Sequence, residues 1–306
     1  MQPSDAPWLL VGCGYTGTRL ARRLLTDGAR VVATRRTAEA AARTAAGLGS
    51  AADVRVVDLL HPETMDGLVE AGALVVHSAP PAAPAGTGEE NLVAVAAAAG
   101  ARRLVYVSSS GVYGRGAGDW IDEDAAVAPT GPIGQRRLEA ESALLAAAAR
   151  LRLSAVSLRA AAIYGPHRGS HVSIGAGNHR VPDSAGCVSR IHVDDLGSAI
   201  LAAALAHQLP HAIYNVADDE PTRARSFADA VAAALGVTPP PTVAPDQSSP
   251  AARELLGGDR RVANRRLVEE LGVRLAYPTW REGLRQALAE EARGPAGNRQ
   301  SAKSAK

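Results

Sequence analysis

The sequence predicts a doubly wound α/β fold, in which helices cover both faces of a parallel sheet. Short apolar or β-branched runs alternate with longer segments rich in Ala, Leu, Arg and Glu, and this alternation is typical of βαβ units. A glycine-rich turn joins the first run to the first helical segment. The chain has 306 residues, of which 46% are hydrophobic and 21% charged, so it has room for one large or two modest globular cores.

The strands of this sheet are predicted from apolar runs that end at glycine, proline or polar residues. They are residues 8–11, 30–34, 54–57, 73–77, 104–107 and 155–158. The segments between them are long enough for helices and consist of good helix formers. The predicted helices are residues 18–26, 37–47, 89–99 and 136–150.

The pattern changes after about residue 160. Residues 165–190 are rich in Gly, His, Ser and Arg and show little periodicity, so we expect a functional loop or small subdomain there. Beyond it we predict a helix at 194–207, a strand at 213–216, a helix at 227–235, a turn-rich connection at 239–250, and helices at 264–271 and 279–292. We therefore expect a dinucleotide-binding domain (1–165), a smaller substrate-side portion (166–293) and a disordered tail (294–306).

Composition excludes several classes of function. A net charge of +2 offers little attraction to nucleic acid or to a membrane surface. Cys13 and Cys187 are too few for a disulfide framework, and no secretory signal or membrane-spanning run is evident, so a cytoplasmic protein is expected. Of the 33 basic residues only Lys303 and Lys306 are lysines. A mechanism that needs a lysine in the folded body is therefore excluded.

The strongest local motif is the G-x-G-x-x-G pattern at residues 12–17, between the first strand and a helix. Gly12 permits a tight turn, Gly14 lets the backbone approach a pyrophosphate, and Gly17 allows close helix packing. Tyr15 and Thr16 begin the helix whose free N–H groups would face the phosphates. The pattern predicts dinucleotide binding, against the alternative of a purely structural turn.

The residues after the second strand bear on which dinucleotide binds. An acid that holds the ribose of NAD is expected there, but the chain has Arg35 and Arg36, and no carboxylate before Glu39. A guanidinium matches a phosphate, so we predict NADP, with NAD as the alternative. The alternative is that the arginines form a solvated turn. Asp58 is placed by position to meet the adenine.

With these residues the chain resembles the short-chain dehydrogenase/reductase superfamily, in its extended branch of NAD-dependent epimerases and dehydratases. The resemblance covers roughly residues 8–290 and rests on residues 12–17, 57–59, 76–79, 105–114, 158–166, 191–195 and 214–216. It implies a Rossmann-type sheet and adds Leu59, His77, Ser78 and Ala79 to the expected cofactor contacts.

The resemblance also implies a catalytic set, and here the chain departs from the family. Ser109 matches the serine that holds the reacting carbonyl or hydroxyl. The family's Tyr-x-x-x-Lys pair aligns with Ile133 and Arg137. Ile133 has no proton to exchange, and Arg137 could contact a ribose or phosphate but cannot act as an acid or base. The chain is therefore similar to atypical members that keep the cofactor fold and lose the pair.

Other residues are weaker candidates for chemistry. The resemblance puts Ser110, Tyr164, His192 and Asp194 on the substrate side, although Asp194 is more simply a helix cap. Tyr113 is more simply a packing residue, and His77 a buried histidine. His167, His171, His179, Cys187 and His192 match no metal-ligand spacing, so no metal is expected, and Cys13 is expected to pack under the turn.

Two hypotheses for function remain open. One is an NADP-dependent oxidoreductase or epimerase-like enzyme that acts on a small polar substrate held by Ser109. The other is a non-catalytic NADP-binding sensor or scaffold, which the residues at 133 and 137 favour. The Ala-rich helices 89–99 and 136–149 resemble the family's dimer-forming pair, which implies a homodimer, but helices buried within one subunit would show the same pattern.

Overall fold

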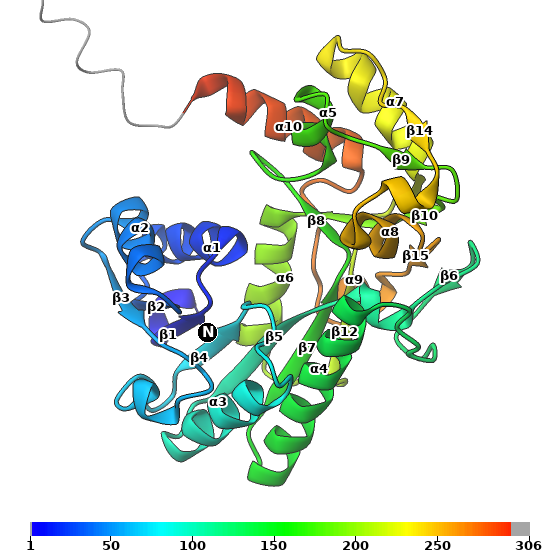
Figure 1. The fold of residues 1–306 in the computed structure, drawn as a ribbon. Helices are drawn as coiled ribbons and strands as arrows, with labels where there is room; N and C mark the ends of the chain where they lie inside the picture. Colours follow the sequence, from blue (N-terminus) through cyan, green and yellow to red (C-terminus); the bar gives the residue numbers. More distant parts are fainter. Residues whose placement is uncertain (1, 295–306) are drawn as a thin grey trace, which may run out of the picture.

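The computed structural model describes residues 2–294 and contains a seven-stranded parallel sheet (Figure 1). The strand order is β12-β7-β5-β4-β1-β2-β3. The bounds are β1 (Trp8–Val11), β2 (Val31–Arg35), β3 (Ala52–Val56), β4 (Leu74–His77), β5 (Arg103–Ser109), β7 (Ala155–Ala160) and β12 (Ile213–Val216). This topology confirms the predicted doubly wound fold. The predicted tail lies outside the described residues apart from Gly294.

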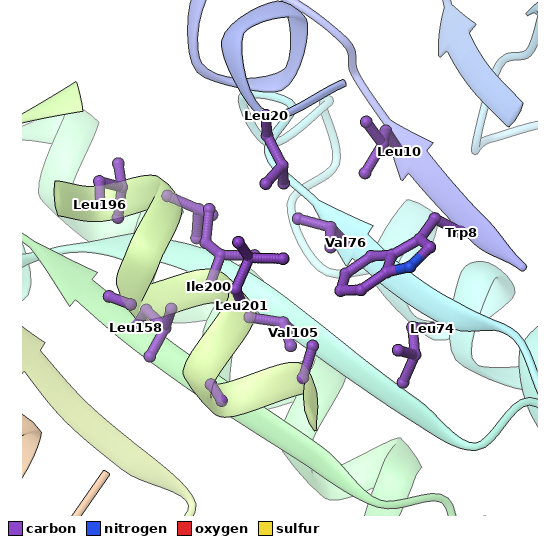
Figure 2. Close-up of a cluster of buried hydrophobic side chains, with 14 of the residues drawn as sticks. Trp8, Leu10, Leu20, Leu74, Val76, Val105, Leu158, Leu196, Ile200 and Leu201 are labelled. Atoms are coloured by element: carbon purple, nitrogen blue, oxygen red, sulfur yellow. The ribbon is translucent and has the colours of Figure 1, made fainter. Parts of the chain in front are cut away.

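Helices cover both faces of the sheet because its strands are apolar on both sides. One face carries α1 (Tyr15–Thr26), α2 (Ala38–Leu48) and α6 (Val193–Leu205), and the other carries α3 (Thr87–Ala98) and α4 (Pro132–Leu151) (Figure 1). Along β1, Trp8 and Leu10 join the core under α1 and α6, whereas Leu9 and Val11 join the core under α3 and α4. Figure 2 shows the first of these cores.

The remaining elements lie mostly in the second half of the chain, beyond the carboxyl ends of β5 and β7 (Figure 1). The helices are α5 (Ser170–Gly175), α7 (Ala224–Leu235), α8 (Pro250–Leu256), α9 (Arg265–Glu269) and α10 (Trp280–Arg293). The short strands are β6 (Trp120–Ile121), β8 (Ala162–Tyr164), β9 (Val181–Pro182), β10 (Cys187–Val188), β11 (Arg190–His192), β13 (Thr222–Arg223), β14 (Thr242–Val243) and β15 (Arg261–Val262). The 3-10 turns are η1 (Pro3–Asp5), η2 (Pro62–Met65), η3 (Ser110–Tyr113) and η4 (Pro245–Gln247).

The irregular segments differ most from expectation. The predicted loop 165–190 contains α5 and the short strands β9 and β10, and the connection 239–250 contains β14 and η4. Helix α8 was not predicted, because its seven residues are too few to show a helical period. Its start is nevertheless marked, since the Ser249 side chain accepts a hydrogen bond from the Ala252 N–H.

The sheet and its helices include elements from both sides of the proposed boundary at residue 165. Strand β12 and helix α6 follow that residue in the chain, yet β12 pairs with β7 and α6 packs on the sheet core. The division into a dinucleotide-binding domain and a substrate-side portion therefore stays a prediction about which residues serve which role.

Candidate functional site

A cavity of about 980 Å³ opens along the carboxyl ends of the central strands. Parallel sheets of this topology bind ligands at that edge. The predicted site residues that line it are Gly12, Gly14, Tyr15, Thr16, Arg35, Arg36, Asp58, Leu59, Ser78, Ala79, Ser109 and Arg137. The structure thus brings together residues at the carboxyl ends of β1 to β5, together with Arg137 of α4.

The glycine loop packs closely against residues at the ends of the two strands that flank β1. Gly12 has φ +75°, and a Cβ built there would lie 2.4 Å from the Cβ of Ala79, a separation that no side chain tolerates. The Gly12 N–H donates to Oγ1 of Thr34 at 3.2 Å. Helix α1 begins directly after Gly14, so its free N–H groups face the cavity and fit a bound phosphate.

Cys13 lies beneath this loop and does not face the cavity. Its side chain is fully buried, and burial raises the pKa of its thiol. A thiol in this state is a poor nucleophile. A Cβ at Gly17 would lie 3.4 Å from the Cys13 sulfur, so both residues serve the packing of α1.

The end of the cavity next to β2 is basic. Arg35, Arg36 and Thr37 line it, and Nη1 of Arg35 donates to the Cys13 carbonyl at 2.8 Å. This bond fixes the Arg35 guanidinium beside the glycine loop. Asp58 also lines the cavity, and one of its carboxylate oxygens accepts the Leu60 N–H at 3.1 Å.

The opposite end of the cavity carries Ser109 and Arg137. Ser109 caps η3, and its Oγ accepts the Gly111 N–H at 3.0 Å, so its own O–H remains to donate. Nη1 of Arg137 donates to the Tyr106 hydroxyl at 3.0 Å and to the Val107 carbonyl at 3.2 Å. The Arg137 charge is therefore anchored to β5.

Tyr106 is not a substitute for the missing tyrosine. Burial raises the pKa of its hydroxyl to about 12, against the opposing effect of Arg137. Its ring is fully buried and does not line the cavity. It positions Arg137 and is too weak an acid to donate a proton near neutral pH.

The position of the family tyrosine holds no proton donor. Ile133 lies in the first turn of α4, is 47% exposed and does not line the cavity. The backbone N–H groups of Ile133 and Gly134 donate to the Glu254 carboxylate of α8, at 3.4 and 2.6 Å. Glu254 thus caps the start of α4 and ties α8 to it.

Several predicted residues lie outside the cavity lining, namely Gly17, His77, Ser110, Tyr164, His192 and Asp194. His77 is fully buried, and its Nε2 lies 3.2 Å from Oε1 of Glu89, which does line the cavity. Tyr164 is buried, and burial strongly raises its pKa. Outside the predicted set, Tyr113 donates from its hydroxyl to Oδ1 of Asn215 at 2.8 Å, which leaves it a packing role.

The expected cap of α6 needs correction. His192 is the N-cap residue, and its Nδ1 accepts the Asp194 N–H at 3.3 Å. Asp194 lies inside the first turn and pairs with Arg19 of α1 at 2.8 Å. An acid in the first turn stabilises the helix through the dipole, so Asp194 supports α6 without capping it.

Two structural findings concern metal binding and membrane spanning. Within residues 2–294, no group of three or more His, Cys, Asp or Glu side chains is arranged to hold a metal ion. In the same part of the chain, no helix has both the length and the apolar character that crossing a membrane requires.

Among the cavity residues that sequence reasoning missed are Arg168 and Leu255, from the second half of the chain. Arg168 follows β8, and its guanidinium carbon lies 5.2 Å from the centre of the Tyr15 ring. Leu255 of α8 is 41% exposed and also lines the cavity. The only signal for Arg168 was the arginine and histidine content of residues 165–190.

Comparisons with known proteins identify the family of the chain. The model of the NAD dependent epimerase/dehydratase family matches residues 8–217. A 3-diazoavenalumate denitrifying reductase from Streptomyces sp is 33% identical over 215 residues, which are 64% of this chain and 68% of that protein.

Solved structures share the fold over nearly the whole chain. A conserved protein of unknown function from Silicibacter pomeroyi is 32% identical, with a TM-score of 0.79 over 94% of this chain and 99% of that one. MoeE5 in complex with UDP-glucose and NAD is 23% identical, with a TM-score of 0.72 over 94% of this chain and 99% of that one. The second likeness is evidence for the fold alone.

Proposed function

Because the chain belongs to the NAD-dependent epimerase/dehydratase family, we propose that it is an NADP-dependent reductase whose substrate needs no proton from the enzyme. The observation that carries this proposal is the pairing of a complete dinucleotide cavity with Ile133 at the proton-donor position. A carbonyl reductase would need an acid there.

The residues present fit a nicotinamide dinucleotide. The close packing of Gly12 on Ala79 and the free N–H groups of α1 make a cradle for the pyrophosphate. Arg35 and Arg36 fit a 2′-phosphate, and Arg137 fits the polar groups of the second ribose. When bound, the reduced nicotinamide supplies a hydride.

The denitrifying reductase suggests a substrate class that suits this site. Its name describes the reductive loss of nitrogen from a diazo compound. When hydride replaces the diazonium group of an arene, a C–H bond forms, the C–N bond breaks, and its electron pair leaves with N₂. Charge and atoms balance without a proton. We therefore propose an arenediazonium compound as the substrate class, since this balance holds for the diazonium cation.

This chain's residues would orient such a substrate and exclude water. Ser109 has an O–H to donate toward a polar group of the substrate. Leu255, Ile163 and Pro81 contribute apolar surface to the cavity, which suits an aromatic or aliphatic body. Arg137 offers a fixed positive charge to a carboxylate on the substrate or to the cofactor.

The proposal is tested with NADPH that carries deuterium at its transferable hydride and with a carboxylated benzenediazonium salt as the probe. We expect oxidation of one NADPH for each molecule reduced, with deuterium in the arene product. A protein-free reaction is the control for spontaneous reduction. If NADPH is bound but oxidised no faster than in that control, the reductase proposal is wrong.

That negative result would favour the second candidate, a cofactor-binding protein without catalysis. The specific observation in its favour is the exposed Ile133, which gives epimerase or carbonyl chemistry no acid. A change in partner binding or in assembly between the NADPH-bound and free states would then be the activity to measure.

The basic end of the cavity predicts a preference for NADPH over NADH. A charge-assisted hydrogen bond contributes about 1.5 to 3 kcal/mol, so fluorescence titration should give at least about a tenfold difference in Kd. The R35A/R36A variant should abolish it. R43A removes an arginine of α2 that does not line the cavity, and should leave the preference intact. Equal affinities in the wild type would contradict the assignment.

A further inference from the structure

Arg168 brings a positive charge from the second half of the chain to the glycine loop. It lines the same cavity as Gly14, Tyr15 and Thr16, and its guanidinium stacks 5.2 Å from the centre of the Tyr15 ring. We propose that Arg168 binds the pyrophosphate of the dinucleotide and closes the cofactor site from the substrate-side portion. This inference rests on the proposed function, because it needs a bound dinucleotide.

The guanidinium is available for a ligand. Within residues 2–294 no carboxylate pairs with Arg168, and no side chain or carbonyl accepts a hydrogen bond from its guanidinium. Stacking on an aromatic ring occupies the face of a guanidinium and leaves its N–H edges free to donate. Those edges match the paired oxygens of a phosphate.

Two of the other cavity arginines, Arg35 and Arg137, already donate hydrogen bonds within the protein. Arg35 is fixed to the Cys13 carbonyl at the basic end, with Arg36 next to it in the chain. Arg137 is fixed to Tyr106 and to the carbonyl of Val107. At the start of α1, Arg168 can therefore add free N–H donors to the backbone N–H groups that face a pyrophosphate.

The backbone that carries Arg168 is held in place before any ligand binds. Gly165 and Arg168 exchange two backbone hydrogen bonds, each of 2.9 Å, and close a tight turn. The Tyr15 hydroxyl donates to the Pro166 carbonyl at 3.0 Å, and Glu291 of α10 accepts the His167 N–H. Preorganisation of this kind lowers the entropy cost of binding.

The test is a calorimetric titration with ADP-ribose, which has the pyrophosphate but neither the nicotinamide nor the 2′-phosphate. R168A should weaken ADP-ribose binding about tenfold, and R168K should retain part of the affinity. Binding of 2′-AMP, which lacks the pyrophosphate, should not change. R180A, an arginine of the same segment outside the cavity lining, should bind ADP-ribose like the wild type.

The outcomes separate this proposal from the one on which it rests. Unchanged ADP-ribose affinity in R168A, with or without a higher KM for the substrate, would overturn the role of Arg168 and leave the cofactor site intact. Equal weakening of ADP-ribose and 2′-AMP would also overturn it, since Arg168 would then only support Tyr15. A wild-type protein that binds no ADP-ribose would overturn both proposals.

Discussion

Replacing Gly12 with alanine should lower NADPH affinity about a hundredfold and destabilise the protein. Gly12 has φ +75°, and the added Cβ would lie 2.4 Å from Cβ and 2.6 Å from Cα and N of Ala79. The left-handed conformation costs an alanine about 1 to 2 kcal/mol, and overpacking against backbone costs about 1 to 3 kcal/mol more. Since both Gly12 and Ala79 line the cavity, relief of the clash must deform the cofactor site.

The measurements are a thermal melt and a fluorescence titration with NADPH. For a chain of this size we expect a fall in Tm on the order of 10 °C. Gly28 is the matched control, because it has φ +78° but no atom within 4 Å of an added Cβ. G28A should lose about 1 kcal/mol and keep its cofactor affinity. If G12A behaves like G28A, the contact with Ala79 does not shape the glycine loop.

The sheet could be predicted because its signals are local. Trp8–Val11 and Ile213–Val216 are apolar runs bounded by polar residues or turns, and both were predicted with the bounds that the structure gives. The sequence predicts that the fifth strand ends at Val107, because Ser108 and Ser109 are polar, whereas β5 extends to Ser109. In the structure these serines continue the strand and pair with Arg159 and Ala160 of β7, because neighbouring strands impose the conformation.

The cofactor loop could be predicted for the same reason, since its glycines are adjacent in the chain. The long-range contacts around the cavity could not be predicted. The Tyr15 hydroxyl and the Pro166 carbonyl are 151 residues apart, and the Gly134 N–H and Glu254 are 120 residues apart. Contacts of this kind depend on how irregular segments fold over the sheet, and those segments have no periodicity.

The buried contacts near the cavity could not be predicted from the sequence either. His77 was expected beside the cofactor, but its partner Glu89 faces the cavity instead. Tyr106 was visible only as a residue of a strand. Its contact with Arg137 exists because α4 packs on β5, and one sequence cannot show that packing.

The largest change in chemistry is expected from restoring the family's proton donor. The wild type should reduce simple carbonyl compounds at a rate near background, because Ile133 has no proton and general acid catalysis contributes about 10² to 10⁴-fold. I133Y/R137K should raise NADPH-dependent carbonyl reduction at least about tenfold. Ile133 is 47% exposed, so a tyrosine there can be accommodated, and residue 137 lies one helical turn further along α4.

We attribute this gain to the tyrosine hydroxyl. The control is I133F/R137K, because phenylalanine has the same ring without the hydroxyl. That variant should stay near background, and reduction of the diazonium probe should be similar in both double variants because it needs no acid. Carbonyl reduction by I133Y/R137K should fall as the pH rises through the pKa of the new tyrosine, since only the protonated phenol donates. Equal gains in the two variants would contradict the role of the hydroxyl. Robust carbonyl reduction by the wild type would show that another acid acts, and replacement of His77, Tyr164, His192 and Asp194 one at a time would identify it.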